Sequence, residues 1–168
     1  MNESLDLPRN IAIVHEWFTP RSTGGAENVV KVIDDLLIEI GSRPEFFSLV
    51  NEENLDENSW LFQRKVKTSF IQKLPFGVSH VQQYLPLLPF AIEQLDLDGY
   101  PLIISSSHLV AKGILTSPDQ LHISYVHTPV RYAWDQMNIY LKRSFLRRIG
   151  LGPLIRCCLL YTSDAADE

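Results

Sequence analysis

The chain has 168 residues, 45% of them hydrophobic, and a formal net charge of -5 at pH 7. This length and apolar content predict one domain with its own core, and the acidic balance argues against a nucleic-acid partner bound through a basic surface. No apolar run reaches the roughly 20 residues of a membrane-spanning helix, and the first ten residues lack the charged-then-apolar order of a secretion signal. We therefore expect a cytoplasmic protein.

Apolar runs alternate with longer helical patterns along the chain, which favours the α/β class. The run from Ile11 to Trp17 is continuous and β-branched, as in a central strand covered on both faces. From Glu27 to Ile40, apolar residues recur every three or four positions, and Gly41 stands at the C-cap of that predicted helix. These patterns predict a Rossmann-like parallel sheet with helices on both faces.

The other predicted elements follow in the same alternation. Prolines interrupt one of the helical segments, and the stretch before it, 66–77, has no regular pattern. Further strands are predicted at 45–50, 100–108 and 121–129, and further helical segments at 79–97, 109–113 and 131–150.

The end of the chain differs from the rest. Two adjacent cysteines, Cys157 and Cys158, are neither a disulfide framework nor a zinc spacing. The stretch CLLYTSDAADE at 158–168 matches one reading frame of a transposon-based sequencing-library adapter, so we expect a translated artefact, with a natural acidic tail as the alternative. On this view residues 1–10 are an extension, 11–157 form one incomplete domain, and the natural protein continues further.

Two adjacent glycines, Gly24 and Gly25, stand where the first strand hands over to the first helix. They can simply supply the backbone freedom for a tight turn. Alternatively, their missing side chains let main-chain N–H groups and the positive helix end approach a diphosphate. Neither G-x-G-x-x-G nor G-x-x-x-x-G-K-[ST] occurs, which argues against a nicotinamide enzyme and a P-loop NTPase.

Four segments in one order carry a family resemblance. They are IAIVHEWFTPRSTGGAENVV, TSFIQKLPF, LPLLPFAIEQLDLDGYPLIISSSHLVAKG and SYVHTPVRYAWD. Together they resemble the N-terminal domain of bacterial glycosyltransferase family 4, enzymes of the GT-B fold that use nucleotide sugars. The motifs SSSH-x-x-AKG and HTP-x-RY-x-W are similar to those of mannosyltransferase-like enzymes of surface polysaccharide assembly.

The resemblance implies a two-domain retaining enzyme with its active site in the cleft between two halves. This chain corresponds to the acceptor-side half, and Gly24 and Gly25 occupy the loop that faces the diphosphate of a GDP- or UDP-sugar. The other half normally carries two glutamates separated by seven residues. Glu45 and Glu53 match that spacing formally, but they run from a predicted strand into a loop, so we do not assign them this role.

His127 stands at the end of a predicted parallel strand, the edge at which open α/β sheets bind ligands. A lone histidine is commonly structural, but the resemblance implies a catalytic contact to a donor hydroxyl or phosphate oxygen, supporting the charge that develops as the bond breaks. It is not assigned as a general base, because in such enzymes the leaving phosphate is thought to assist the acceptor hydroxyl.

Further polar and aromatic residues near the strand ends are candidates for the acceptor site. Arg131 offers a planar fork for phosphate or carboxylate, and Trp134 offers an apolar face for a sugar. Each is equally well explained as a solvated or a core side chain, and Ser106 is equally well explained as a helix cap. His15 and Glu16 either face the cleft or point into packing. The candidate acceptor residues are Arg131, Tyr132, Trp134, His108 and Lys112, beside Thr128.

The sequence also bears on metal binding and on membrane contact. The five histidines form neither H-x-x-x-H nor H-E-x-x-H, so we predict no essential metal and no cofactor besides the nucleotide-sugar co-substrate. The stretches KVKTSFIQKLPF and LKRSFLRRIG combine bases with bulky apolar residues, which suits either a peripheral contact with the cytoplasmic membrane or packing between domains.

The expected function is transfer of a hexose, with mannose the favoured example, to a polysaccharide or lipid-linked glycan acceptor. The residues 1–168 alone are expected to be inactive, because the contacts to donor and transition state are divided between two domains. The alternative from another class is a non-catalytic module that binds a sugar nucleotide or a glycan.

Overall fold

The computed structural model describes residues 7–20, 24–53 and 56–127. Five strands form one sheet in the order β3-β2-β1-β4-β5, and every neighbouring pair is parallel. This confirms the predicted Rossmann-like parallel sheet. The strands are β1 (Ile11–Phe18), β2 (Glu45–Asn51), β3 (Val66–Thr68), β4 (Leu102–Ser107) and β5 (Leu121–Val126).

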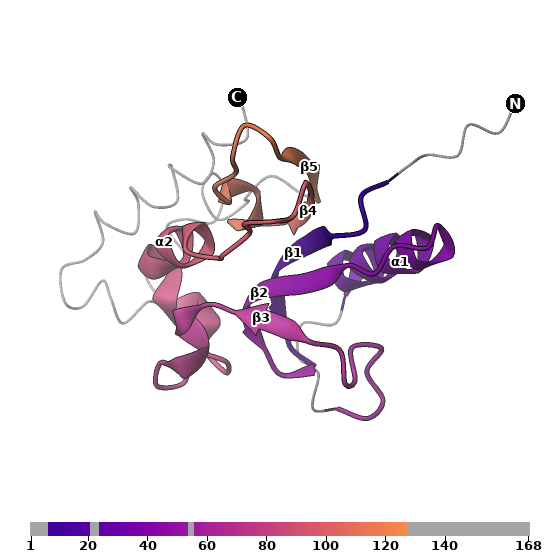
Figure 1. Cartoon of the computed structure of the whole chain (residues 1–168). Helices are drawn as coiled ribbons and strands as arrows, with labels where there is room; N and C mark the ends of the chain where they lie inside the picture. The colour runs from indigo at the N-terminus through magenta and orange to yellow at the C-terminus, as the bar shows by residue number, and fades with distance from the viewer. Residues whose placement is uncertain (1–6, 21–23, 54–55, 128–168) are drawn as a thin grey trace, which may run out of the picture.

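Helices cover both faces of the sheet, as predicted (Figure 1). The long helix α1 (Gly25–Glu39) lies on one face, and α2 (Leu88–Glu93) lies on the other. The 3₁₀ helices η2 (Phe70–Lys73), η3 (Val81–Leu87) and η4 (Ala111–Gly113) each contribute a buried side chain to the core on the α2 side.

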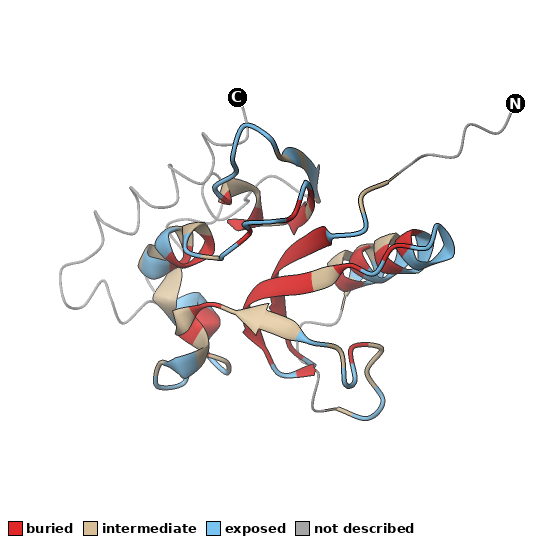
Figure 2. Cartoon of the chain, in the orientation of Figure 1, coloured by how far each residue is buried: buried red, intermediate tan, exposed pale blue. Residues whose placement is uncertain are grey.

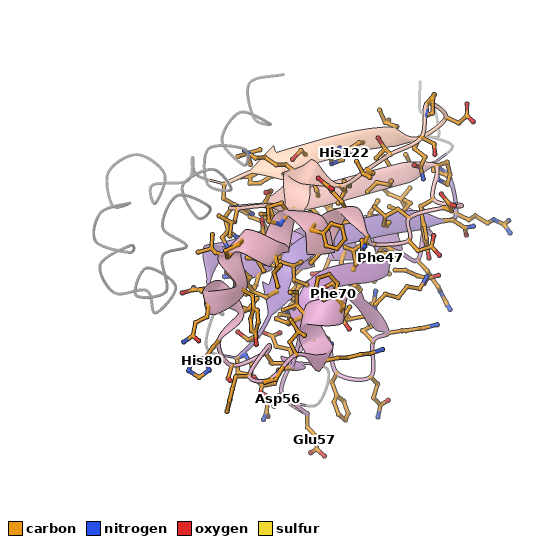
Figure 3. All side chains as sticks on the ribbon, turned by 90° about the vertical axis from the view of Figure 1, so that its left-hand side faces the viewer. Phe47, Asp56, Glu57, Phe70, His80 and His122 are labelled. Carbon is orange, nitrogen blue, oxygen red and sulfur yellow. The ribbon has the colours of Figure 1, made fainter. Side chains whose placement is uncertain are left out.

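The continuous apolar run of β1 contributes to two cores at once, because successive strand side chains point to opposite faces. Ile11 and Ile13 pack with Val30 and Leu37 of α1. Ala12 and Val14 belong to the cluster on the other face. Phe47 is buried in this cluster, and the partly buried Phe70 packs against the cluster (Figure 3). The central strands are therefore buried, whereas β5 is largely exposed (Figure 2).

Two details refine the sequence-based expectations. Strand β3 was not predicted, because it has three residues and its apolar signal is a single valine. The predicted interruption of 79–97 is confirmed: Pro86 lies inside η3 and Pro89 lies in the first turn of α2, where a missing N–H costs nothing. The predicted helix at 131–150 lies outside the described residues.

Within the described part of the chain, none of the helices combines the length and the apolar character that crossing a membrane requires.

Candidate functional site

The order of the strands has a topological switch point between β1 and β4. From β1 the chain proceeds to β2 on one side, whereas from β4 it proceeds to β5 on the other. At such a switch point the connecting loops diverge at the carboxyl ends of the strands, which is where open α/β sheets bind ligands. Polar residues gather at these ends: His15 and Glu16 on β1, Ser106 and Ser107 on β4, and His108 and His127 just after β4 and β5.

Glu16 is a fully buried carboxylate around which the turn after β4 is folded. Its Oε1 accepts a hydrogen bond from Ser107 Oγ at 3.0 Å. The same oxygen receives four main-chain N–H groups, those of residues 108, 109, 110 and 111, at 2.8–3.1 Å. Successive N–H groups that converge in this way form a nest for an anion, and here the protein supplies the anion itself.

The other oxygen of Glu16 faces an imidazole. Glu16 Oε2 lies 2.9 Å from His108 Nδ1, and the His108 side chain is 26% exposed. Burial alone raises the pKa of Glu16, but contact with His108, the charge of His15 and the Ala111 N–H outweigh it and hold that pKa well below its usual range. Burial alone lowers the pKa of His108, but the Glu16 carboxylate outweighs it and raises that pKa. The two groups form an ion pair in which Glu16 is buried and His108 is partly exposed.

His15 connects β4 to the start of α1, where Gly24 and Gly25 form what we call the glycine turn. Its Nδ1 donates to the main-chain oxygen of Ser106 at 2.9 Å, and its Nε2 lies 3.8 Å from Glu27 Oε1. Glu27 Oε2 in turn accepts the N–H of Gly24 at 2.9 Å. Burial alone raises the pKa of Glu27, but contact with His15 outweighs it and lowers that pKa. Glu27 is therefore an anion at the positive end of α1.

His127 contacts this cluster from the end of β5. Its main-chain N–H donates to the Ser107 carbonyl at 2.9 Å, and its Nε2 lies 2.7 Å from Ser106 Oγ. Burial and the neighbouring His15 lower the pKa of His127, so the imidazole is neutral at pH 7.

The structure brings most of the described sequence-predicted residues to one edge of the sheet. A chain of contacts runs from Gly24 through Glu27, His15 and Ser106 to His127. Gly25 is exposed, and a side chain added there would meet nothing within 4 Å. His108 lies in the same cluster, and Lys112 lies in η4, partly buried. The candidates Arg131, Tyr132 and Trp134, with Thr128, lie outside the described residues.

A metal fits this cluster poorly. One ligand atom from each of His15, Glu16 and His108 lies within 4.8 Å of the others. However, five donors already surround one Glu16 oxygen, the second lies against His108, and His15 Nδ1 carries the proton that it donates to Ser106. Three buried atoms of the cluster, His15 Nε2, Glu16 Oε2 and His108 Nδ1, have no hydrogen-bond partner among the described residues, and the last two lie at ion-pair distance from each other. We derive no step through a metal.

Sequence reasoning missed Glu27 as a member of the site. The signal was its position three residues after Gly24, where a carboxylate can reach back to the N–H of the residue that precedes the helix. It also left the direction of His15 and Glu16 open, because a strand pattern alone does not show which side chains leave the core at the strand end.

Comparisons with known proteins add no identification, because no protein family, curated protein or solved structure matches this chain.

The Glu16 to His108 ion pair predicts a pH-dependent contribution to stability. Glu16→Gln should lower the free energy of unfolding by about 3–5 kcal/mol, since it removes the buried carboxylate that pairs with the partly exposed His108. The exposed Glu39→Gln, at the end of α1, is the matched control and should stay within about 0.5 kcal/mol. Urea denaturation of the three proteins measures both values.

The direction of the pH dependence follows from the two pKa shifts. The contribution of His108 to the free energy of unfolding is complete below its ordinary pKa of 6.5 and is lost as the pH rises through its raised pKa. The contribution of Glu16 is complete above its ordinary pKa of 4.5 and is lost as the pH falls toward its lowered value. The difference between wild type and Glu16→Gln should therefore be largest between pH 4.5 and 6.5 and shrink at alkaline pH. A difference that stays constant into the alkaline range contradicts the ion pair.

Proposed function

We propose that this chain is the acceptor-side domain of a nucleotide-sugar-dependent glycosyltransferase, the N-terminal half of a GT-B enzyme. The observation that carries the proposal is the convergence of the glycine turn and His127 at the switch point of a parallel sheet. Four sequence segments that resemble family 4 supply the reaction class, and the described parts of those segments contribute Gly24, His108 and His127 to this one edge.

The donor diphosphate is assigned to the first turn of α1. The first intrahelical hydrogen bond runs from the Asn28 N–H to the Gly24 carbonyl, so the N–H groups of residues 25–27 precede it. Because the Gly24 N–H already donates to Glu27, we assign the phosphate oxygens to the N–H groups of Gly25 and Ala26. Open space at Gly25 permits that approach.

His127 is assigned to the reacting end of the donor. As a neutral imidazole it offers one N–H donor to a sugar hydroxyl or phosphate oxygen, which supports charge that develops on the leaving group. His108 and Lys112 are assigned to the acceptor, together with Arg131, Tyr132 and Trp134 from the sequence motif. A hexose from a GDP- or UDP-sugar, mannose in particular, would pass to a polysaccharide or lipid-linked glycan with retention of configuration. A second domain would bind the nucleotide.

Transfer activity tests the proposal directly. The product of the complete reading frame should transfer labelled hexose from one member of a GDP- and UDP-sugar panel to a glycan or lipid-linked acceptor. His127→Ala should lower kcat by about 10²–10³-fold, the loss typical of one transition-state donor. It should also cost about 1–3 kcal/mol of stability, because the buried Ser106 hydroxyl loses its acceptor. The exposed His80→Ala, on a different part of the chain, is the matched control and should leave kcat unchanged.

The same assay separates the enzyme from the alternative. Binding of a sugar nucleotide or glycan without transfer from any donor in the panel would favour a non-catalytic binding module. If the product neither binds a sugar nucleotide or glycan nor transfers a sugar, both proposals are excluded.

The diphosphate assignment predicts opposite effects on stability and on binding at Gly25. Gly25→Asp places a negative charge in the first turn of α1, where the helix dipole stabilises it by about 0.3–1 kcal/mol, and the new Cβ meets nothing within 4 Å. The same charge should weaken nucleotide-sugar binding by at least 10-fold, measured by calorimetry on the active product. Gly25→Ala adds only a methyl group in open space and is the milder control. Unchanged affinity in Gly25→Asp would remove the diphosphate from this turn.

We also propose a peripheral membrane contact at the loop around Phe76. Phe76 is 76% exposed and has a left-handed backbone, φ 57°, which is a costly conformation for a bulky side chain. Tyr84 holds this loop by donating to the Pro75 carbonyl at 2.6 Å. No Asp or Glu occurs between Glu57 and Glu93, whereas that stretch includes the exposed Lys65 and Lys73. An aromatic group held out beside bases suits an anionic lipid surface.

Vesicle flotation tests this contact. The protein should float with phosphatidylglycerol-containing vesicles, less so at high salt, and Phe76→Ser should reduce the floating fraction severalfold because it removes the apolar anchor. Leu115→Ser, at a residue that is 65% exposed elsewhere in the chain, is the matched control. Equal losses for both variants, or no salt-sensitive flotation of wild type, contradict the proposal.

A further inference from the structure

Two adjacent serines of β4 each hold a histidine of the neighbouring strand segment. Ser105 Oγ lies 2.8 Å from His122 Nε2, and Ser106 Oγ lies 2.7 Å from His127 Nε2. Adjacent residues of a strand point to opposite faces, so these are two separate pairs. His122 lies on β5, at the edge of the sheet (Figure 3). The pairs look alike, but the positions of their protons differ.

The hydroxyl proton of Ser105 takes part in a hydrogen bond to another serine. Its hydroxyl donates to Ser124 Oγ at 2.9 Å. A hydroxyl has one proton, so Ser105 Oγ must accept from His122, and the proton of that imidazole lies on Nε2.

Ser106 has a different set of partners. Its side chain is fully buried, and among the described residues His127 Nε2 is the acceptor within reach of its hydroxyl. A buried hydroxyl proton without an acceptor is costly, so the proton of Ser106 is donated to His127 Nε2. A neutral imidazole that accepts at Nε2 carries its own proton on Nδ1.

The main chain of Ser106 is fixed as well. His15 Nδ1 donates to the Ser106 carbonyl at 2.9 Å, and β4 pairs with β1 and β5 on its two sides. The hydroxyl of Ser106 is thus attached to the most buried part of the sheet, whereas His127 follows the end of the exposed strand β5.

We infer that Ser106 is the positioning residue of His127: its hydroxyl fixes the Nδ1–H tautomer and makes Nδ1 the nitrogen that donates to a bound ligand oxygen. The tautomer follows from the described contacts, whereas its meaning for catalysis rests on the proposed transferase function. The Tyr125 ring packs against His127 with centroids 4.9 Å apart, and the charged or ionisable groups that act on the pKa of His127 are His15, Glu16, His108 and Glu27. Among the described residues, the hydrogen bond to the His127 ring comes from Ser106.

Histidine NMR on the 168-residue chain tests the tautomer without any substrate. The chain contains five histidines, so a long-range ¹H–¹⁵N spectrum of ¹⁵N-histidine-labelled protein at alkaline pH resolves five imidazoles. Wild type should show His127 protonated on Nδ1 and His122 protonated on Nε2. Ser106→Ala should change the His127 pattern toward a mixture of tautomers and leave His122 unchanged, and Ser105→Ala should do the reverse. Ser106→Thr retains the hydroxyl and should restore the wild-type His127 pattern.

A wild-type spectrum with His127 protonated on Nε2 overturns the inference, and this result needs no variant to fold. An unchanged His127 pattern in folded Ser106→Ala overturns it as well.

A second readout addresses catalysis. In the active product, Ser106→Ala should lower kcat by about 10-fold or more with KM little changed, because a misplaced donor weakens contacts in the transition state. Ser105→Ala removes an equally buried serine hydroxyl and should leave kcat within about twofold. Equal losses in the two variants overturn the positioning role in catalysis. The predicted tautomer in a product without transfer activity overturns the proposed function and leaves the assignment of the proton intact.

Discussion

The buried carboxylate of Glu16 organises the polar edge of this molecule. A charge without solvent is unfavourable unless donors surround it, and here the donors come from a turn more than 90 residues away in sequence. The carboxylate therefore binds the turn after β4 to the end of β1. The same group holds His108, which is partly exposed, as its ion-pair partner. The turn after β4 and the charge next to it thus depend on a single side chain.

A second buried carboxylate, Glu27, does the corresponding work at the other connection. It receives the N–H of Gly24 and approaches His15, so the entry into α1 is held against β1. The two glutamates bind different main-chain donors: the nest after β4 is filled by Glu16, whereas the first turn of α1 retains N–H groups ahead of its first internal hydrogen bond. This difference is why the proposed diphosphate site lies at α1 and not at the turn after β4.

The histidines illustrate how one residue type acquires different properties from its surroundings. His108 faces a carboxylate and has a raised pKa, whereas His127 faces a serine hydroxyl and has a pKa lowered by burial and by His15. One is suited to binding an anionic or hydroxylated group as a cation, and the other to donating a hydrogen bond as a neutral ring. Both lie within one polar cluster, so the proposed site combines a charged donor and a neutral donor.

Periodicity alone determined much of the fold. The continuous β-branched run of β1 and the three-and-four spacing of α1 are local signals, because burial on both faces and an amphipathic helix impose them on neighbouring residues. The positions of the glycine pair before α1 and of His127 after β5 could also be predicted, because they follow from where these elements begin and end. Parallel strands place their carboxyl ends at one edge of the sheet. The short strand β3 was not readable, because pairing with β2, rather than its own composition, makes it a strand. Only the tertiary structure decided that Glu16 turns into a nest of N–H groups, that Glu27 reaches back to Gly24, and that Ser106 rather than Ser105 holds His127. Those choices depend on contacts between segments as much as 95 residues apart, and a one-dimensional pattern carries no record of which distant groups will meet.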